Sequence, residues 1–104
     1  MYKPLPESLT IQQSGINGLG LFARESLKQG MNLGMSHLKI KDTLFRTPLG
    51  GFINHGNTPN VVKVELLMTY ENGTKVNYKK WNLVTLCDIK KGEELTVKYT
   101  FYNV

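Results

Sequence analysis

The stretch that decides the fold lies in the middle of the chain and reads Gly51-Phe52-Ile53-Asn54-His55-Gly56-Asn57-Thr58-Pro59-Asn60. Its polar side chains follow the apolar end of a strand. They precede a turn in which Pro59 restricts the backbone. Asn54 can donate and accept hydrogen bonds, which suits a zwitterionic ligand, and His55 could be a base, a metal ligand or a structural anchor. Alternatively, the Asn side chains only satisfy buried amides of a turn. No metal is expected, because no carboxylate or cysteine lies nearby and His37 is the only other histidine.

Length and composition favour a single soluble domain over residues 1–104. The chain is 40% hydrophobic and 10% aromatic, and a chain of this length buries roughly 65% of the surface that it exposes when unfolded. No stretch approaches the ~20 apolar residues of a membrane span, and the first residues lack the pattern of a targeting segment. We therefore expect a cytoplasmic protein without membrane contact. The single cysteine, Cys87, excludes an internal disulfide and a cysteine-rich zinc site.

The net charge of +5 comes from eleven lysines and two arginines that are spread along the chain. Proteins that read base edges favour clustered arginines, which this sequence lacks. We expect no nucleic-acid site beyond loose electrostatic contact. The positive charge is also unfavourable for a lysine-rich substrate, because basic segments prefer acidic grooves.

Short strands dominate the pattern, and no window keeps the apolar periodicity of a helix without an interrupting Gly or Pro. The predicted strands are 9–13, 19–23, 31–33, 37–40, 61–70, 75–79, 81–87 and 94–99. Asn72-Gly73 lies between two strand patterns and tolerates the positive φ of both central residues in a type I′ turn, so it predicts a hairpin. Residues 26–33 and 88–95 share one order of apolar residue, Lys, polar residue and Gly, which predicts the same tight turn twice. The fold class is mainly β.

A second candidate binding segment reads Gly15-Ile16-Asn17-Gly18-Leu19-Gly20-Leu21-Phe22-Ala23. Glycines around a strand start let the backbone approach a ligand closely and leave amides for a carboxylate or phosphate. The order G-x-x-G-x-G differs from the dinucleotide fingerprint, and no helix follows to supply a dipole. Taken alone, such a segment is more often a plain loop.

The third candidate segment reads Gly92-Glu93-Glu94-Leu95-Thr96-Val97-Lys98-Tyr99-Thr100-Phe101-Tyr102. Alternation places Leu95, Val97 and Tyr99 on one face of a strand, where Tyr99 taken alone is more often a core residue. Together with Phe101 and Tyr102, it could instead form a narrow aromatic channel. Such a channel suits an alkyl-ammonium side chain through cation-π and apolar contacts.

In this order, the three segments resemble the SET-domain family of protein lysine methyltransferases over essentially the whole chain. Residues 18–23 match the family's first motif, residues 52–60 match F-x-N-H-S-x-x-P-N, and residues 92–99 match G-E-E-L-x-x-D-Y. The resemblance implies a fold of several small curved sheets. It also implies that the C-terminal strand passes through a loop beside the Asn-His turn and forms a pseudoknot.

The resemblance further implies S-adenosylmethionine as cofactor and a protein with a target lysine as substrate. Tyr99 would carry the catalytic hydroxyl, and Phe101 and Tyr102 would line the substrate channel. The residues expected to bind the cofactor are Asn17, Gly18, Leu19, Gly20, Asn54, His55 and Tyr99. A homodimer is a further expectation, and a viral protein of this kind would act in the cytoplasm or nucleus of its host cell.

Three departures from the family pattern leave other functions open. Lys98 replaces the usual Asp before Tyr99, Gly56 replaces the usual Ser, and the variable segment at 41–49 is short. One alternative is a SET-fold module that binds the cofactor or a partner but has little or no activity. The other is a small basic β-domain that binds nucleic acid without chemistry.

Overall fold

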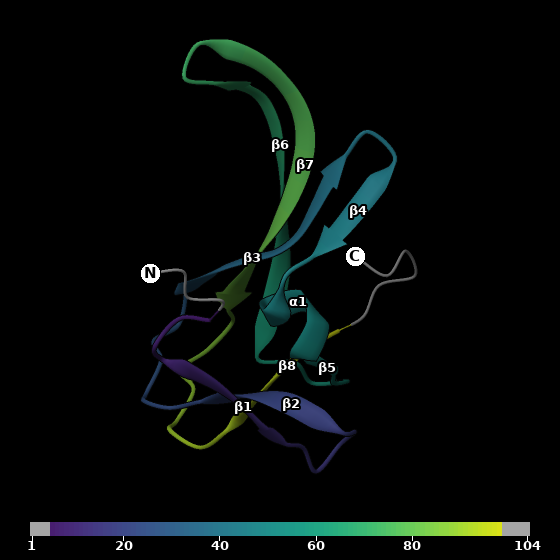
Figure 1. Cartoon of the computed structure of the whole chain (residues 1–104). Coiled ribbons are helices and arrows are strands. Elements are labelled where there is room, and N and C mark those ends of the chain that lie inside the picture. The colour runs from purple at the N-terminus through teal and green to yellow at the C-terminus, as the bar shows by residue number, and fades with distance from the viewer. Residues whose placement is uncertain (1–4, 99–104) are drawn as a thin grey trace.

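The computed structural model describes residues 5–98, apart from the side chains of residues 70 and 71. Within these residues the chain forms eight strands and one short helix (Figure 1). The elements are β1 (Leu9–Gln13), β2 (Leu19–Ala23), β3 (Asn32–Ile40), β4 (Thr43–Arg46), α1 (Pro48–Phe52), β5 (Asn54–His55), β6 (Val61–Glu71), β7 (Thr74–Thr85) and β8 (Glu94–Val97). Among the described residues, no helix has the length and apolar character needed to cross a bilayer.

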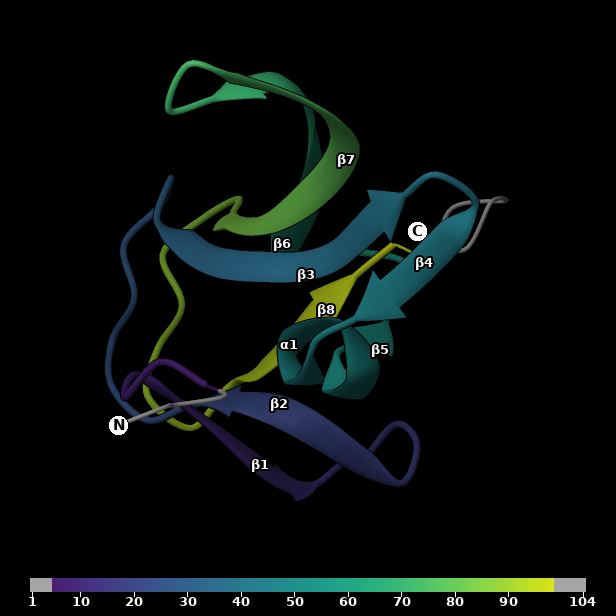
Figure 2. The ribbon, with the colours of Figure 1, turned by 45° about the horizontal axis from the view of Figure 1, so that its top comes forward.

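The strands form one hydrogen-bonded network in the order β1-β2-β8-β6-β7-β3-β4, with β5 added beside β8. Strands β6 and β8 share one residue pair, Val61 with Val97. The network therefore divides into two curved parts that meet at β8. In Figure 2, β1 and β2 lie on one side of β8 and α1, and β3, β6 and β7 lie on the other. This arrangement confirms the predicted mainly β fold of small curved sheets.

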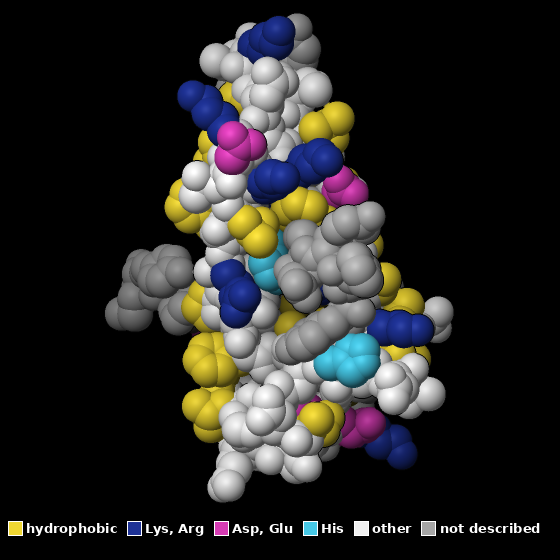
Figure 3. Space-filling model, turned by 90° about the vertical axis from the view of Figure 1, so that its right-hand side faces the viewer, with side chains coloured by type: hydrophobic (Ala, Val, Ile, Leu, Met, Phe, Trp, Pro, Cys, Tyr) yellow, Lys and Arg dark blue, Asp and Glu magenta, His cyan; other side chains and the backbone are white. Residues whose placement is uncertain are grey.

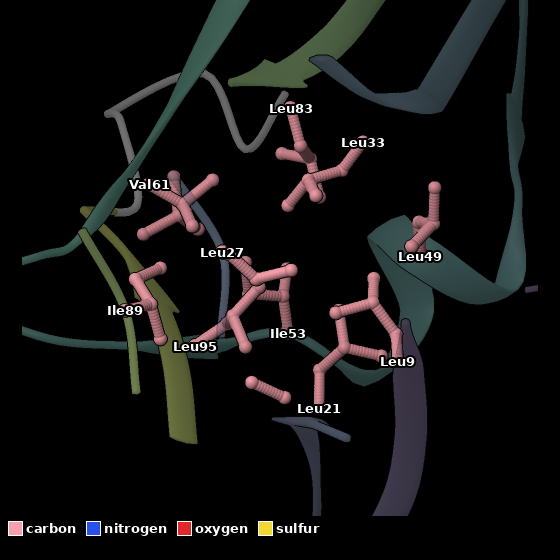
Figure 4. Packing of buried hydrophobic residues seen from close by; sticks show 12 residues of the cluster. Leu9, Leu21, Leu27, Leu33, Leu49, Ile53, Val61, Leu83, Ile89 and Leu95 are labelled. Atoms are coloured by element: carbon pink, nitrogen blue, oxygen red, sulfur yellow. The ribbon is translucent and has the colours of Figure 1, made fainter. Parts of the chain in front are cut away.

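The hydrophobic core fills the space where the two parts meet. Leu21 of β2, Leu83 of β7 and Leu95 of β8 are completely buried, and Leu27 and Ile89 join them from the connecting loops. Figure 4 shows these side chains converging from different elements. Burial of one such side chain stabilises the fold by about 1.5–3 kcal/mol. The core is therefore what fixes the two parts of the network relative to each other.

Strand predictions are confirmed at β1, β2 and β6. The strand predicted at 94–99 corresponds to β8, which ends at Val97, and two further predictions need correction. The predicted strands 31–33 and 37–40 are one strand, β3, because register shifts at residues 32–34 and 35–37 interrupt its alternation without ending it. The predicted strands 75–79 and 81–87 likewise form one strand, β7. Strand β4 was not predicted, because the four residues Thr43–Arg46 are all exposed and lack a buried face.

Helix α1 was also absent from the sequence prediction. Thr47 caps its N-terminus by accepting a hydrogen bond from the backbone N–H of Gly50, and Pro48 occupies the first turn. The helix is only five residues long and contains two glycines. It is too short to show a helical period, so the capping residues were its only signal in the sequence.

The predicted hairpin and the two predicted glycine turns are confirmed. Asn72 and Gly73 have φ of 53° and 79°, as a type I′ turn between β6 and β7 requires. Gly30 and Gly92 also have positive φ, of 79° and 90°. The segments 26–33 and 88–95, which carry these glycines, pair with each other through an isolated bridge between residues 27 and 89. The recurring sequence pattern thus marks two similar turns that lie side by side.

Candidate functional site

The side chain of Asn54 joins all three sequence motifs at one point. Asn54 lies on β5, and 9% of its surface is exposed. Its Nδ2 lies 2.9 Å from Oε2 of Glu94 and 3.1 Å from Oγ of Ser14. The same nitrogen lies 3.1 Å from the carbonyl oxygen of Asn17 and 3.3 Å from that of Leu19. Hydrogen bonds from one amide therefore connect β5, the glycine loop before β2, and β8.

These contacts determine which atom of Asn54 can meet a ligand. An amide nitrogen has two N–H groups, and four acceptors surround the one on Asn54. Its donors are thus fully used inside the protein. No residue among 5–98 donates a hydrogen bond to the side-chain oxygen of Asn54. The sequence suggested both donor and acceptor roles, but the structure leaves Asn54 with an acceptor role only.

Ser14 and Glu94 complete the network, and the sequence motifs did not single out either residue for a role. The Ser14 hydroxyl donates to the Glu94 carboxylate, with both carboxylate oxygens at 2.8 Å. Ser14 Oγ also accepts hydrogen bonds from the backbone N–H groups of Ile16 at 2.8 Å and Asn17 at 3.3 Å. This polar cluster shapes the glycine loop. The one sequence signal for it was the acidic residue of the C-terminal motif that opens β8.

The glycines of the loop are required for two different physical reasons. At Gly20, an added Cβ would collide with the Glu94 carboxylate and lie 3.1 Å from Asn54 Nδ2. Gly18 has a φ of 49°, and its missing Cβ would point into open space. Gly20 therefore allows the cluster to close, whereas Gly18 allows the loop to turn and leaves open space beside it. The structure brings the predicted residues Asn17 to Gly20 beside Asn54.

His55 occupies a turn next to Asn54, but its ring makes a different contact. The ring Nε2 lies 3.2 Å from Oδ1 of Asn57, and the His55 backbone pairs with Val97 of β8. No group of three or more metal-binding side chains occurs among the described residues. The contact with Asn57 fits a structural anchor, and the expected cofactor-binding role of His55 stays a prediction.

Gly56 departs from the usual Ser of the family motif, and its neighbour Thr96 gives the reason. A Cβ at Gly56 would lie 2.8 Å from both Cβ and Oγ1 of Thr96. The backbone N–H of Gly56 donates to the carbonyl oxygen of Val97 at 3.1 Å. A residue without a side chain thus lets this turn approach β8 closely.

Asn60 holds β8 against the Asn-His turn. Its Oδ1 accepts a hydrogen bond from the backbone N–H of Thr96 at 2.8 Å, and its Nδ2 donates to the carbonyl oxygen of Glu94 at 3.0 Å. These two bonds satisfy β8 backbone groups and place the Glu94 side chain beside Asn54. Tyr99, Phe101 and Tyr102 lie outside the described residues, so their catalytic and channel roles and the pseudoknot stay predictions.

Solved structures that resemble this chain share its fold at low sequence identity. A candidate histone methyltransferase of Plasmodium falciparum matches with a TM-score of 0.70 and 17% identity, over 93% of this chain and 96% of that one. The structure of ctPRC2 in an autoinhibited conformation bound to S-adenosylmethionine matches with a TM-score of 0.69 and 18% identity. That match covers 92% of this chain and 15% of the ctPRC2 chain. A comparison with curated protein sequences gave no match.

A family model of the SET domain matches residues 35–100, which is more than half of the chain. The matched segment contains the Asn-His turn, β8 and Asn60, which holds β8 against this turn. These are the elements that the structure assembles around the Asn54 amide. The motifs, the fold and the family model therefore agree, and the chain belongs to the SET-domain family.

Proposed function

We propose that this protein is an S-adenosylmethionine-dependent methyltransferase that modifies a lysine side-chain amine of another protein. The observation that carries the proposal is the buried Asn54 amide, whose nitrogen is bound internally and whose oxygen is left to accept. The ctPRC2 structure that resembles this chain is described as bound to S-adenosylmethionine, which supports the choice of cofactor.

The residues around Asn54 fit the amino acid end of this cofactor. That end carries an ammonium group, which needs acceptors and negative charge. Asn54 Oδ1 supplies an acceptor, and the Glu94 carboxylate places negative charge 2.9 Å from the same amide. The loop leaves open space beside Gly18, and the half-exposed Leu19 supplies an apolar surface next to it. When bound, the cofactor supplies an electrophilic methyl group.

The substrate amine must reach the site without its proton. A free lysine has a pKa of ~10.4, so its neutral form costs about 4–5 kcal/mol near pH 7. Surroundings that disfavour a positive charge reduce this cost. Such surroundings occur at Lys63: burial and then the positive charge of Arg46 lower the pKa of its amine. Lys63 lies close to β8 in the sheet, because Val61, two positions before it on β6, pairs with Val97 of β8.

The aromatic residues after β8 take their proposed roles from the family motif. Tyr99 would orient the target amine through its hydroxyl, and Phe101 and Tyr102 would exclude water from the channel. Lys98 is exposed at the end of β8. We therefore treat the replacement of the usual Asp as compatible with activity.

Two measurements test this function. Binding of S-adenosylmethionine should raise the melting temperature of the wild-type protein, and Asn54→Ala should abolish this shift. Transfer of a labelled methyl group to proteins of a cell lysate should then be lost in Tyr99→Phe and retained in the matched control Tyr70→Phe, near the hairpin end of β6. Cofactor binding without any transfer would instead support an inactive SET-fold module. Absence of binding would contradict the proposed function.

A further inference from the structure

Two lysines face each other across neighbouring strands of the larger sheet. Lys39 of β3 and Lys79 of β7 are direct cross-strand partners, a position that places Cβ atoms about 4.5–5.5 Å apart. Lys79 forms an ion pair of 3.4 Å with Glu65, but no described carboxylate pairs with Lys39. Like charges in direct opposition destabilise a sheet. Glu65 offsets the charge of Lys79, so Lys39 leaves an excess positive charge here that an external carboxylate can offset.

Positive charge continues along the same face toward β8. Cross-strand partners share a face, as do alternate residues of one strand, so His37, which pairs with Arg46, lies on the face of Lys39. The electrostatics agree with this placement, because burial and the charges of Lys63 and Arg46 lower the pKa of His37 to about 4. We call this surface the basic face: its basic side chains are Lys39, Arg46, Lys63 and Lys79, and the acidic Glu65, the partner of Lys79, also lies on it.

A shallow hollow lies at the end of the basic face. Its lining consists of Lys39, Lys41, Leu67, Asn77, Tyr78 and Lys79. Lys41 has a φ of 54°, a left-handed conformation that costs a residue with a side chain about 1 kcal/mol. Glycine or asparagine would fit this turn better. A third lysine thus occupies a strained position at the edge of the hollow.

We propose that the basic face binds an acidic segment of the protein substrate, which lies next to the target lysine. This inference rests on the proposed function. Glutamate or aspartate side chains over Lys39 and Lys79 would relieve the repulsion between these lysines. Lys63 pairs with Leu83 of β7, and Lys79 lies four positions from Leu83 on the same strand. The two lysines are thus offset by about 14 Å along the strand direction. A bound segment that runs along the strands from Lys63 to Lys79 therefore covers about four residues.

The composition of the basic face favours a protein segment over a nucleic acid as its ligand. Binding of single strands relies on exposed aromatic rings on which bases stack. Trp81 lies on this face, but its ring packs edge to face against His37, with centroids 6.5 Å apart and planes at 90°. In Figure 3, Lys and Arg side chains occur from the top to the bottom of the visible face, and acidic side chains lie beside several of them. Such an arrangement suits a few carboxylates better than a long run of phosphates.

Two short peptides test the inference, each with one central lysine and a fluorescent label, flanked either by glutamates or by arginines. We expect the glutamate peptide to bind the wild-type chain at least about tenfold more tightly in fluorescence anisotropy at low salt. The double variant Lys39→Glu/Lys79→Glu should lose about tenfold in this affinity. The control Lys28→Glu/Lys91→Glu changes the net charge equally at two exposed lysines outside the face and should lose less than about twofold.

Equal or tighter binding of the arginine peptide would overturn the inference, as would equal losses in the two double variants. A single-stranded oligonucleotide that binds the face more tightly than the glutamate peptide would also overturn it and assign the face to nucleic acid. Calorimetric titration with S-adenosylmethionine separates this inference from the proposed function. Normal cofactor binding without a charge preference among peptides would refute the basic-face proposal alone, whereas lost cofactor binding would refute the proposed function.

Discussion

The Asn54 amide donates to the Glu94 carboxylate at 2.9 Å and so joins two motifs that lie 40 positions apart. The carboxylate also accepts from Ser14, so it orients the residue proposed to meet the cofactor and supplies negative charge beside it. Glu94 is thus a positioning residue for Asn54.

The variant Glu94→Gln tests this positioning role. It keeps the shape of the side chain but removes the charge and presents an amide to the donors of Ser14 and Asn54. We expect a loss of about 1–3 kcal/mol in the free energy of unfolding and roughly tenfold weaker binding of S-adenosylmethionine. Urea unfolding and calorimetric titration measure these effects. The exposed Glu25→Gln serves as control, and equal behaviour of the two variants would refute the assignment.

Gly20→Ala tests the steric requirement at the centre of the cluster. The new Cβ would collide with the Glu94 carboxylate, so we expect a destabilisation of about 1–3 kcal/mol and reduced cofactor affinity. Gly15→Ala is a matched control in the same loop, because nothing lies within 4 Å of its added Cβ. Its free energy of unfolding should change by less than about 0.5 kcal/mol. Comparable losses in both variants would refute the collision with Glu94 as their cause.

Gly56→Ser restores the usual family residue and should nevertheless destabilise this protein. The serine Cβ would lie 2.8 Å from Cβ and Oγ1 of Thr96, and relief of this overlap costs about 1–3 kcal/mol. The loss should be smaller in a Thr96→Gly background, since that change removes Cβ, Oγ1 and the methyl group. Thermal unfolding of the wild type, the two single variants and the double variant gives the coupling free energy between positions 56 and 96. Additive effects would show that the two side chains do not meet.

The lowered pKa of His37 leads us to expect that the protein loses stability in acid. Its Nδ1 lies 3.0 Å from Ser36 Oγ, whose hydroxyl donates to the carbonyl oxygen of Trp81, so the neutral ring donates from Nδ1. Burial, Lys63 and Arg46 lower its pKa from 6.5 to about 4. A depressed pKa means that the unfolded chain binds the proton first. Stability is therefore fully present above pH 6.5 and falls as the pH drops from 6.5 toward 4, by at most about 3 kcal/mol.

Urea unfolding between pH 7 and pH 4 measures this dependence in the wild type and in His37→Gln. The variant cannot take up the proton, so its stability should fall less over the same interval. A pH dependence that is identical in the two proteins would assign the acid sensitivity to other groups.

Local chemistry made part of this structure predictable from the sequence. Asn72-Gly73 requires positive φ and predicted its hairpin correctly, and the alternation in β1 and β2 gave their bounds. The contact between Ser14 and Glu94 spans 80 positions, and no local pattern encodes such a partnership. The basic face was missed for the same reason, because Lys39 and Lys79 become neighbours only through the register of β3 and β7. Isolated lysines in the sequence indicated a diffuse charge.

The long separation between Ser14 and Glu94 also affects how the protein folds. Closing loops of this length costs entropy before any contact repays it, so chains that depend on distant strand pairing fold slowly. β8 carries Glu94 and pairs with β2, β5 and β6, three strands that are distant from it in the sequence, so we expect it to dock late. We therefore expect the ability to bind S-adenosylmethionine to appear in the last kinetic phase of refolding, together with the completed core.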